Sequence, residues 1–209
     1  MVPGNRPGEG STVIAAAIQT FVSTDGKSVS QLGMNLSHAE VPDRKYAADT
    51  CAVSYQHQSV RIIFGQERFD GTGLRSAVAV KMSPRAVVQL LASMDSSIPQ
   101  TLMQAIKDEG IEVEKVTSAA MEPTQAVVVL AANLALAAAS GGEGCIDFYQ
   151  ASPFALGVAL HSASNSTANV AIEPVARVDL NTGLLLGLVD ELKRISTQFV
   201  NAQIWRPVT

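Results

Sequence analysis

Apolar and polar residues alternate along much of the chain, and this alternation predicts strands joined into hairpins. Val13–Thr24 and Lys27–Leu36 flank an Asp-Gly pair, which is a strong hairpin signal between two alternating segments. Ala52–Gln66 has the next strand pattern, and Leu74–Met82 returns after a glycine-rich turn. The first half of the sequence therefore predicts antiparallel strands.

Helical spacing replaces this alternation after Met82. Ser83 and Pro84 are typical of an N-cap followed by proline at the first helical position. The apolar residues that follow repeat at the spacing of one helix face: Val87, Leu90, Leu91 and Met94. A shorter helix is expected from about Pro99 to Glu109, because proline starts it and glycine follows it.

The second half shows a similar order of patterns. Ile111–Val116 alternates and predicts a strand, whereas Ala126–Ala139 has valines that favour strand and alanines that favour helix. Phe154–His161 and Val170–Val178 are further strand candidates, with a polar turn between them. Asp179 is then expected to cap a final helix, whose apolar stripe consists of Leu185, Leu188, Val189, Leu192, Ile195 and Phe199.

Two similar hexapeptides suggest that the chain repeats itself. Cys51–Gln56 reads CAVSYQ and Cys145–Gln150 reads CIDFYQ, and each precedes strand patterns and an amphipathic helix. The predicted fold is α+β, with antiparallel β-sheet units that are each covered by a helix and are related by internal duplication. Residues 1–10 form a disordered tail in this prediction, 11–110 the first unit and 111–209 the second. The alternative is a single α+β domain with two unrelated β-β-α segments.

The composition restricts the kinds of partner. The 209 residues are 47% hydrophobic and 16% charged, with a formal net charge of −4. Charge content this low favours a homo-oligomer, because more of the surface is available for burial in contacts. Without a cluster of lysine and arginine, a nucleic-acid or anionic-membrane surface is not expected.

The two cysteines, the N-terminal residues and the longest apolar run favour a cytoplasmic protein. The cysteines are expected to be buried thiols in a reducing compartment rather than a disulfide. Val13–Ile18 is too short for the apolar core of a signal peptide. Ala126–Ala139 falls short of the ~20 residues that span a bilayer, so no membrane span is predicted.

Residues 60–94 resemble a known group of proteins. Ile62-Ile63-Phe64-Gly65-Gln66, followed by a return strand that ends in Lys81-Met82-Ser83-Pro84, is similar to a family of small, uncharacterised bacterial proteins. That family is in turn similar in outline to the SecB-like group, whose members pair an antiparallel sheet with packed helices. The resemblance implies a related fold and, from the well-understood members, binding of extended polypeptide. It implies no catalytic residue.

The sequence contains few candidates for chemistry. It lacks a nucleophile elbow and a phosphate-binding loop, and its three histidines are not at metal-ligand spacing, so no catalytic residue, metal or cofactor is predicted. Tyr55, His57 and Tyr149 are the candidate binding residues. A histidine on the solvent side of a strand is the simpler interpretation of His57.

The sequence therefore predicts a non-catalytic module for protein binding or assembly. Its partner is expected to be a second copy of the chain or another polypeptide, which would add to a strand edge or fill a groove between sheet and helix. The alternative is a small-ligand binder or enzyme with its pocket between the two units, using Tyr55, His57 or Tyr149.

Overall fold

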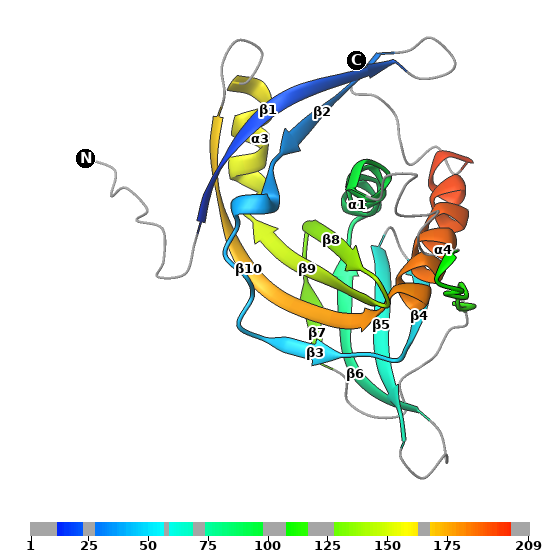
Figure 1. The fold of residues 1–209 in the computed structure, drawn as a ribbon. Coiled ribbons are helices and arrows are strands. Elements are labelled where there is room, and N and C mark those ends of the chain that lie inside the picture. Colours follow the sequence, from blue (N-terminus) through cyan, green and yellow to red (C-terminus); the bar gives the residue numbers. More distant parts are fainter. Residues whose placement is uncertain are drawn as a thin grey trace.

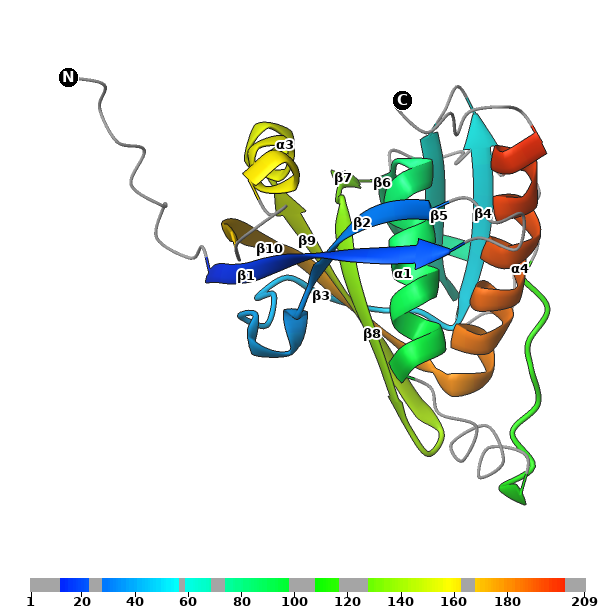
Figure 2. The same cartoon turned by 90° about the horizontal axis from the view of Figure 1, so that it is seen from above.

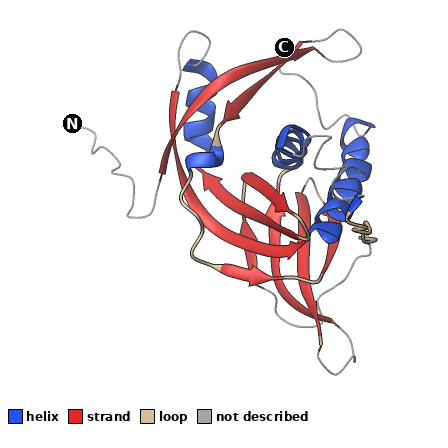
Figure 3. Cartoon of the chain, viewed as in Figure 1, coloured by secondary structure: helices blue, strands red, loops and turns tan. Residues whose placement is uncertain are grey.

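The computed structural model contains two β-sheets and packed helices, which confirms the α+β prediction (Figure 1). It describes residues 12–22, 28–56, 59–68, 74–97, 108–116, 128–162 and 168–201. The predicted tail, His57 and most of the helix expected over Pro99–Glu109 lie outside these residues. Figure 3 shows that strands form most of the described chain, with the helices gathered beside them.

The larger sheet has the strand order β2-β1-β10-β9-β8, and β3 pairs with β10 beside this path. Its strands are β1 (Thr12–Val22), β2 (Ser28–Met34), β3 (Lys45–Ala47), β8 (Leu134–Ser140), β9 (Glu143–Ala151) and β10 (Ala168–Asn181). The antiparallel pairing of β1 with β2 confirms the first predicted hairpin.

The smaller sheet has the order β4-β5-β6-β7. Its strands are β4 (Thr50–Gln56), β5 (Ser59–Glu67), β6 (Leu74–Met82) and β7 (Val129–Ala131). The single strand pattern predicted over Ala52–Gln66 is thus two antiparallel strands. The pairing of β5 with β6 confirms the second predicted hairpin. Ala126–Ala139, for which the sequence favours both strand and helix, contains β7 and most of β8.

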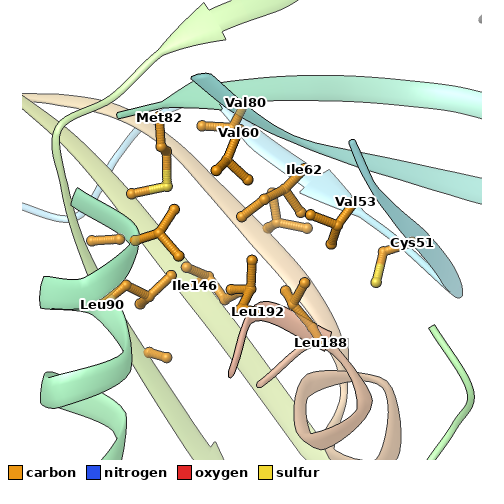
Figure 4. Close-up of a cluster of buried hydrophobic side chains, with 14 of the residues drawn as sticks. Cys51, Val53, Val60, Ile62, Val80, Met82, Leu90, Ile146, Leu188 and Leu192 are labelled. Atoms are coloured by element: carbon orange, nitrogen blue, oxygen red, sulfur yellow. The ribbon is translucent and has the colours of Figure 1, made fainter. Parts of the chain in front are cut away.

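Two long helices pack beside each other between the sheets (Figure 1). The helices are α1 (Pro84–Ser97), α3 (Pro153–Ser162) and α4 (Thr182–Asn201), together with the 3-10 helix η1 (Leu36–His38). The helices predicted after Ser83 and around Leu188 are confirmed as α1 and α4. Their apolar stripes enter one core with strands of both sheets, as Figure 4 shows for Leu90, Leu188 and Leu192.

The strand pairings of residues 45–82 recur in residues 129–181. Thr50 pairs with Gly65, and 84 positions later Leu134 pairs with Tyr149. Both hairpins continue into a third antiparallel strand, β6 or β10, with a register shift next to Gly65 in one and Tyr149 in the other. For this shared pattern of strand pairing alone, we call residues 45–97 repeat 1 and residues 129–195 repeat 2.

The strand ends and helix caps follow the same correspondence. The Asp49 side chain accepts a hydrogen bond from the Glu67 N–H at 2.8 Å, and Asn133 accepts one from the Ala151 N–H at 2.8 Å. At the helix starts, 98 positions apart, Ser83 accepts from Ala86 N–H at 3.2 Å, and Asn181 accepts from Leu184 N–H at 2.7 Å. A side-chain oxygen therefore caps both helices.

The two repeats exchange elements. The short strand β3 of repeat 1 pairs in parallel with β10 of repeat 2, while β7 of repeat 2 pairs in parallel with β6 of repeat 1. Similarly, α1 packs on β8 and α4 packs on β4. The sheets consequently do not divide at the predicted boundary near residue 110.

The matched cysteines do not mark the repeat. Cys51 lies in β4, the first strand of its hairpin, whereas Cys145 lies in β9, the second strand. The residue that corresponds to Cys51 is Ala135, and both are buried. The identical residues at corresponding positions are Ala47 and Ala131, Ala48 and Ala132, Ile62 and Ile146, Phe64 and Phe148, Gln66 and Gln150, Val80 and Val178, and Leu90 and Leu188.

Three local predictions in the second half are wrong. Phe154–His161, predicted as a strand, lies in α3, which starts with Pro153 at its first helical position. Its apolar run has no helical periodicity that would indicate a helix. Asp179 remains in β10, which continues to Asn181, so Asn181 forms the cap instead. Ile111–Val116 joins neither sheet, and its backbone contacts α4.

Candidate functional site

A groove of about 660 Å³ lies where the two repeats meet. Figure 2 shows β7 between α3 and β6, and each of these three elements contributes residues to the lining. The groove is lined by Ser59, Lys81, Met82, Ser83, Arg85, Ala86, Gln89, Ala131, Ala132, Asn133, Gln150, Pro153, Leu156 and Gly157. We call it the α1–α3 groove. Its walls come from both repeats and from α3, which is inserted between β9 and β10.

The first wall is positioned by the junction of β6 and α1. Lys81 is opposite Ala131 in the parallel ladder, and the Lys81 carbonyl accepts a hydrogen bond from the Ala132 N–H at 3.1 Å. Ser83 then caps α1 and so directs the first helical turn along the groove. This junction fixes the backbone positions of Lys81, Ser83 and Arg85, whose side chains are exposed.

The charge of the groove is positive. Lys81 and Arg85 line it, and the described part of its lining contains no carboxylate. Among the residues that the structure describes, no aspartate or glutamate forms an ion pair with either cation. The groove is therefore a local positive surface on a chain with a net charge of −4.

The opposite wall combines a rigid strand end with an apolar helix. Asn133 donates from Nδ2 to the Ala151 carbonyl at 2.7 Å and accepts from the Ala151 N–H, which fixes the end of β9. On α3, Phe154 and Val158 follow the lining residues Pro153 and Gly157 in sequence and are 81% and 48% exposed. Two large apolar side chains one helical turn apart are therefore exposed beside the groove.

The structure separates the residues predicted to bind. Tyr55 is half-buried at the main core, where its ring centroid lies 4.9 Å from that of Phe199. Tyr149 is buried in a second cluster, formed by β1, β8, β9, β10, η1 and α3. Neither tyrosine lines the α1–α3 groove, and His57 lies outside the described residues.

Tyr149 belongs to a polar cluster on the central strands of the larger sheet. Asp147 and Arg177 face each other across β9 and β10 and form a two-pronged ion pair, with both N–O distances 2.7 Å. The hydrogen bond from Arg177 to Asp147 raises the pKa of the guanidinium. Burial, supported by the charge of Asp147, raises the pKa of Tyr149 to about 12. Because their pKa values are raised, Arg177 and Tyr149 keep their protons near neutral pH, and the cluster is suited to holding two strands together.

The cysteines are not activated for chemistry. Both are free thiols. Burial raises the pKa of Cys51 to about 12, with the charge of Glu114 as a further cause, and burial also raises the pKa of Cys145. A raised pKa disfavours the thiolate, which is the nucleophile and metal ligand. Cys51 is buried, as predicted, whereas Cys145 is only partly buried, which corrects the prediction for that thiol.

Within the described part of the chain, no three histidine, cysteine, aspartate or glutamate side chains are grouped so that they could hold a metal ion. None of the described helices is long and apolar enough to cross a bilayer.

Sequence reasoning missed the groove residues. The sequence pattern places Lys81 at the end of a strand and Ser83 in a helix cap, and it does not single out Arg85. The available signal was the short spacing of two cations around a capping serine. Cations at this spacing are common on solvated helices. Here they line a groove because β7 and α3 of repeat 2 contribute the rest of its walls.

Comparison with known proteins adds no relative. No protein-family model matches the chain, and searches of curated proteins and of solved structures find no match.

Proposed function

We propose that this chain is an internally duplicated, non-catalytic module that binds an extended segment of another polypeptide in the α1–α3 groove. The observation that carries the proposal is the position of the groove between the repeats, beside an exposed apolar helix face. The common register and common caps of the two repeats support the duplication.

The groove offers the contacts that an extended chain uses. β7 is an edge strand of the smaller sheet and ends in the groove at Ala131. An edge strand provides backbone hydrogen bonds to an added strand, while neighbouring pockets select its side chains. Phe154 and Val158 would cover apolar side chains of the partner.

The lining does not support acid–base or nucleophilic catalysis. Where the structure describes it, the lining contains serine, lysine, arginine and amide side chains but no histidine, cysteine or carboxylate. General acid–base chemistry near neutral pH depends mainly on those missing types. A small-molecule ligand is the second candidate, because the groove volume falls within the roughly 300–1,000 Å³ of ligand sites.

Fluorescence anisotropy with labelled, reduced and carboxymethylated α-lactalbumin as an unfolded probe would test the proposal. We expect saturable binding to the full chain. Gly157→Trp should abolish it, because outside the neighbouring residues and backbone of α3 itself no atom lies within 4 Å of a Cβ at Gly157, so the ring can enter the groove without unfolding α3. Gln198→Trp places the same ring at an exposed position of α4 and should bind like the wild type.

Two results would contradict polypeptide binding. The first is no saturable binding of the unfolded probe. The second is equal binding by the wild type and Gly157→Trp. Light scattering of the same samples distinguishes self-assembly, in which a second copy occupies the groove: Gly157→Trp would then reduce the oligomer mass without any effect of the probe.

A further inference from the structure

The segment Ile111–Val116 lies on α4 at the position that corresponds to the α1–α3 groove. The Glu114 N–H donates to the Gly183 carbonyl at 3.1 Å, and Asn181 Nδ2 donates to Glu114 Oε1 at 2.7 Å. A Cβ on Gly183 or Gly187 would overlap the carbonyl oxygens of this segment, so the backbone lies directly on the helix. Repeat 2 therefore already holds an extended acidic segment at the start of its helix.

The three residues of repeat 2 that contact this segment have counterparts that line the groove of repeat 1. Asn181 corresponds to Ser83, because each is the N-cap of its helix. Counting onward from the caps, Gly183 corresponds to Arg85 and Gly187 corresponds to Gln89. Ser83, Arg85 and Gln89 all line the α1–α3 groove.

From this correspondence we infer that the groove selects an extended acidic segment of its partner, held along the start of α1 as Ile111–Val116 is held along α4. The inference rests on the proposed polypeptide binding and specifies its substrate class.

The groove has the chemistry to hold a carboxylate. Ser83 Oγ accepts a hydrogen bond from the Ala86 N–H, which leaves the hydroxyl hydrogen to donate, as Asn181 Nδ2 donates to Glu114. Arg85 replaces Gly183 and adds a guanidinium that matches carboxylate geometry. Lys81 stands where the second repeat has Asp179, so the sign of the charge beside the cap is reversed.

The larger residues on α1 also change how closely a bound chain can approach the helix. Gly183 and Gly187 let a backbone contact α4 directly, whereas Arg85 and Gln89 extend from α1. A partner segment would therefore lie about a side chain's length further from α1 than residues 111–116 lie from α4. On the side of α1 it would be held by ion pairs more than by backbone hydrogen bonds. Binding should weaken as salt concentration rises.

Two labelled peptides test the inference with the full chain. The first has the sequence of residues 111–116, IEVEKV, and the second has glutamine in place of both glutamates, IQVQKV. We expect the acidic peptide to bind about tenfold more tightly, which corresponds to a few charge-assisted contacts at a partly exposed site. Lys81→Gln combined with Arg85→Gln should remove this difference.

The matched control is Arg75→Gln, which removes an exposed cation of β6 six residues, or about 20 Å, from Lys81. It should leave both affinities unchanged. Equal affinity of the two peptides would overturn the acidic preference while the proposed polypeptide binding stands. Binding of the unfolded α-lactalbumin probe without binding of either peptide would also overturn the inference alone, whereas loss of all three would overturn the proposed function as well.

Discussion

The two repeats build the same strands and the same capped helix, but they differ in what lies on that helix. In repeat 2, Gly183 and Gly187 admit the backbone of residues 111–116, and the start of α4 is covered. In repeat 1, Arg85 and Gln89 occupy the corresponding positions and face a groove. A pair of glycines thus accompanies a helix start that the chain itself covers, whereas longer polar side chains accompany an open groove.

A second difference lies on the central strands. Ile63 faces Ala79 in repeat 1, whereas Asp147 faces Arg177 at the corresponding positions of repeat 2. Both arrangements are compatible with the same strand register, and Ile63, Ala79 and Asp147 are each buried. An apolar pair and a hydrogen-bonded ion pair can therefore serve the same place in this fold.

The strongest test of the comparison concerns Phe64 and Phe148, which occupy corresponding positions. Their rings meet edge to face, with the ring centroids 6.0 Å apart. Both are fully buried in the shared core. We expect Phe64→Ala and Phe148→Ala each to lower the free energy of unfolding by about 3–5 kcal/mol, through lost burial and the cavity left behind. Urea denaturation followed by circular dichroism measures both losses.

The form of the transition is equally informative. Because helices and short strands are exchanged between the repeats, each variant should unfold in one cooperative step. Two separate transitions in Phe64→Ala, with repeat 2 melting at the wild-type urea concentration, would show that the repeats are independent domains.

Much of the fold could be predicted from local patterns. The hairpins, the Ser83 cap and both long helices have strong signals of period two, period 3.6 and capping chemistry. The cysteine-tyrosine-glutamine match is not the correspondence that relates the two segments, because the pairing register that relates Thr50 to Leu134 involves different side chains at most positions. Register is a property of the sheet, and short matches of cysteine, tyrosine and glutamine do not determine it.

The groove could not be predicted for a related reason. It depends on β7 reaching β6 from the other repeat and on α3 being a helix. The apolar run of α3 carries no periodicity that separates helix from strand, and its proline start was the one available signal. Tyr55 and Tyr149 were conspicuous by residue type, yet each fills a different core cluster.

The close contact of Gly187 with the Glu114 carbonyl distinguishes the covered helix α4 from α3. Gly187→Ala should lower the free energy of unfolding by about 2–4 kcal/mol, because the added methyl group overlaps the Glu114 carbonyl and the segment must move. Gly157→Ala in α3 is the matched control, with no atom within 4 Å of the new Cβ. It should be stabilising by up to ~1 kcal/mol through helix propensity. Equal effects in urea denaturation would contradict the close packing of residues 111–116 on α4.

Transplanting residues between the repeats tests the second difference. Asp147→Ile alone leaves Arg177 without its partner and should lower the free energy of unfolding by roughly 2–3 kcal/mol, less than for a fully buried pair because the Arg177 side chain is 25% exposed. Adding Arg177→Ala completes the pair found in repeat 1. The double variant should return to within about 1 kcal/mol of the wild type. A double variant as unstable as the single one would show that the ion pair has a role that an apolar pair cannot replace.

The smallest expected effect is on alkaline stability. The pKa of Tyr149 is raised to about 12 in the folded state from an ordinary value of 10.0, so the folded protein holds this proton more tightly than the unfolded chain. The contribution is full below pH 10 and is lost as pH rises from 10 to 12, by roughly 1–3 kcal/mol. Cys51 adds a similar loss that begins near pH 9, because its pKa is raised from 9.0 to about 12. Cys51→Ala, which copies Ala135 of repeat 2, should therefore reduce the fall in melting temperature between pH 9 and 10, while Tyr149→Phe should act only above pH 10. Identical pH profiles for both variants and the wild type would show that neither proton is held by the fold.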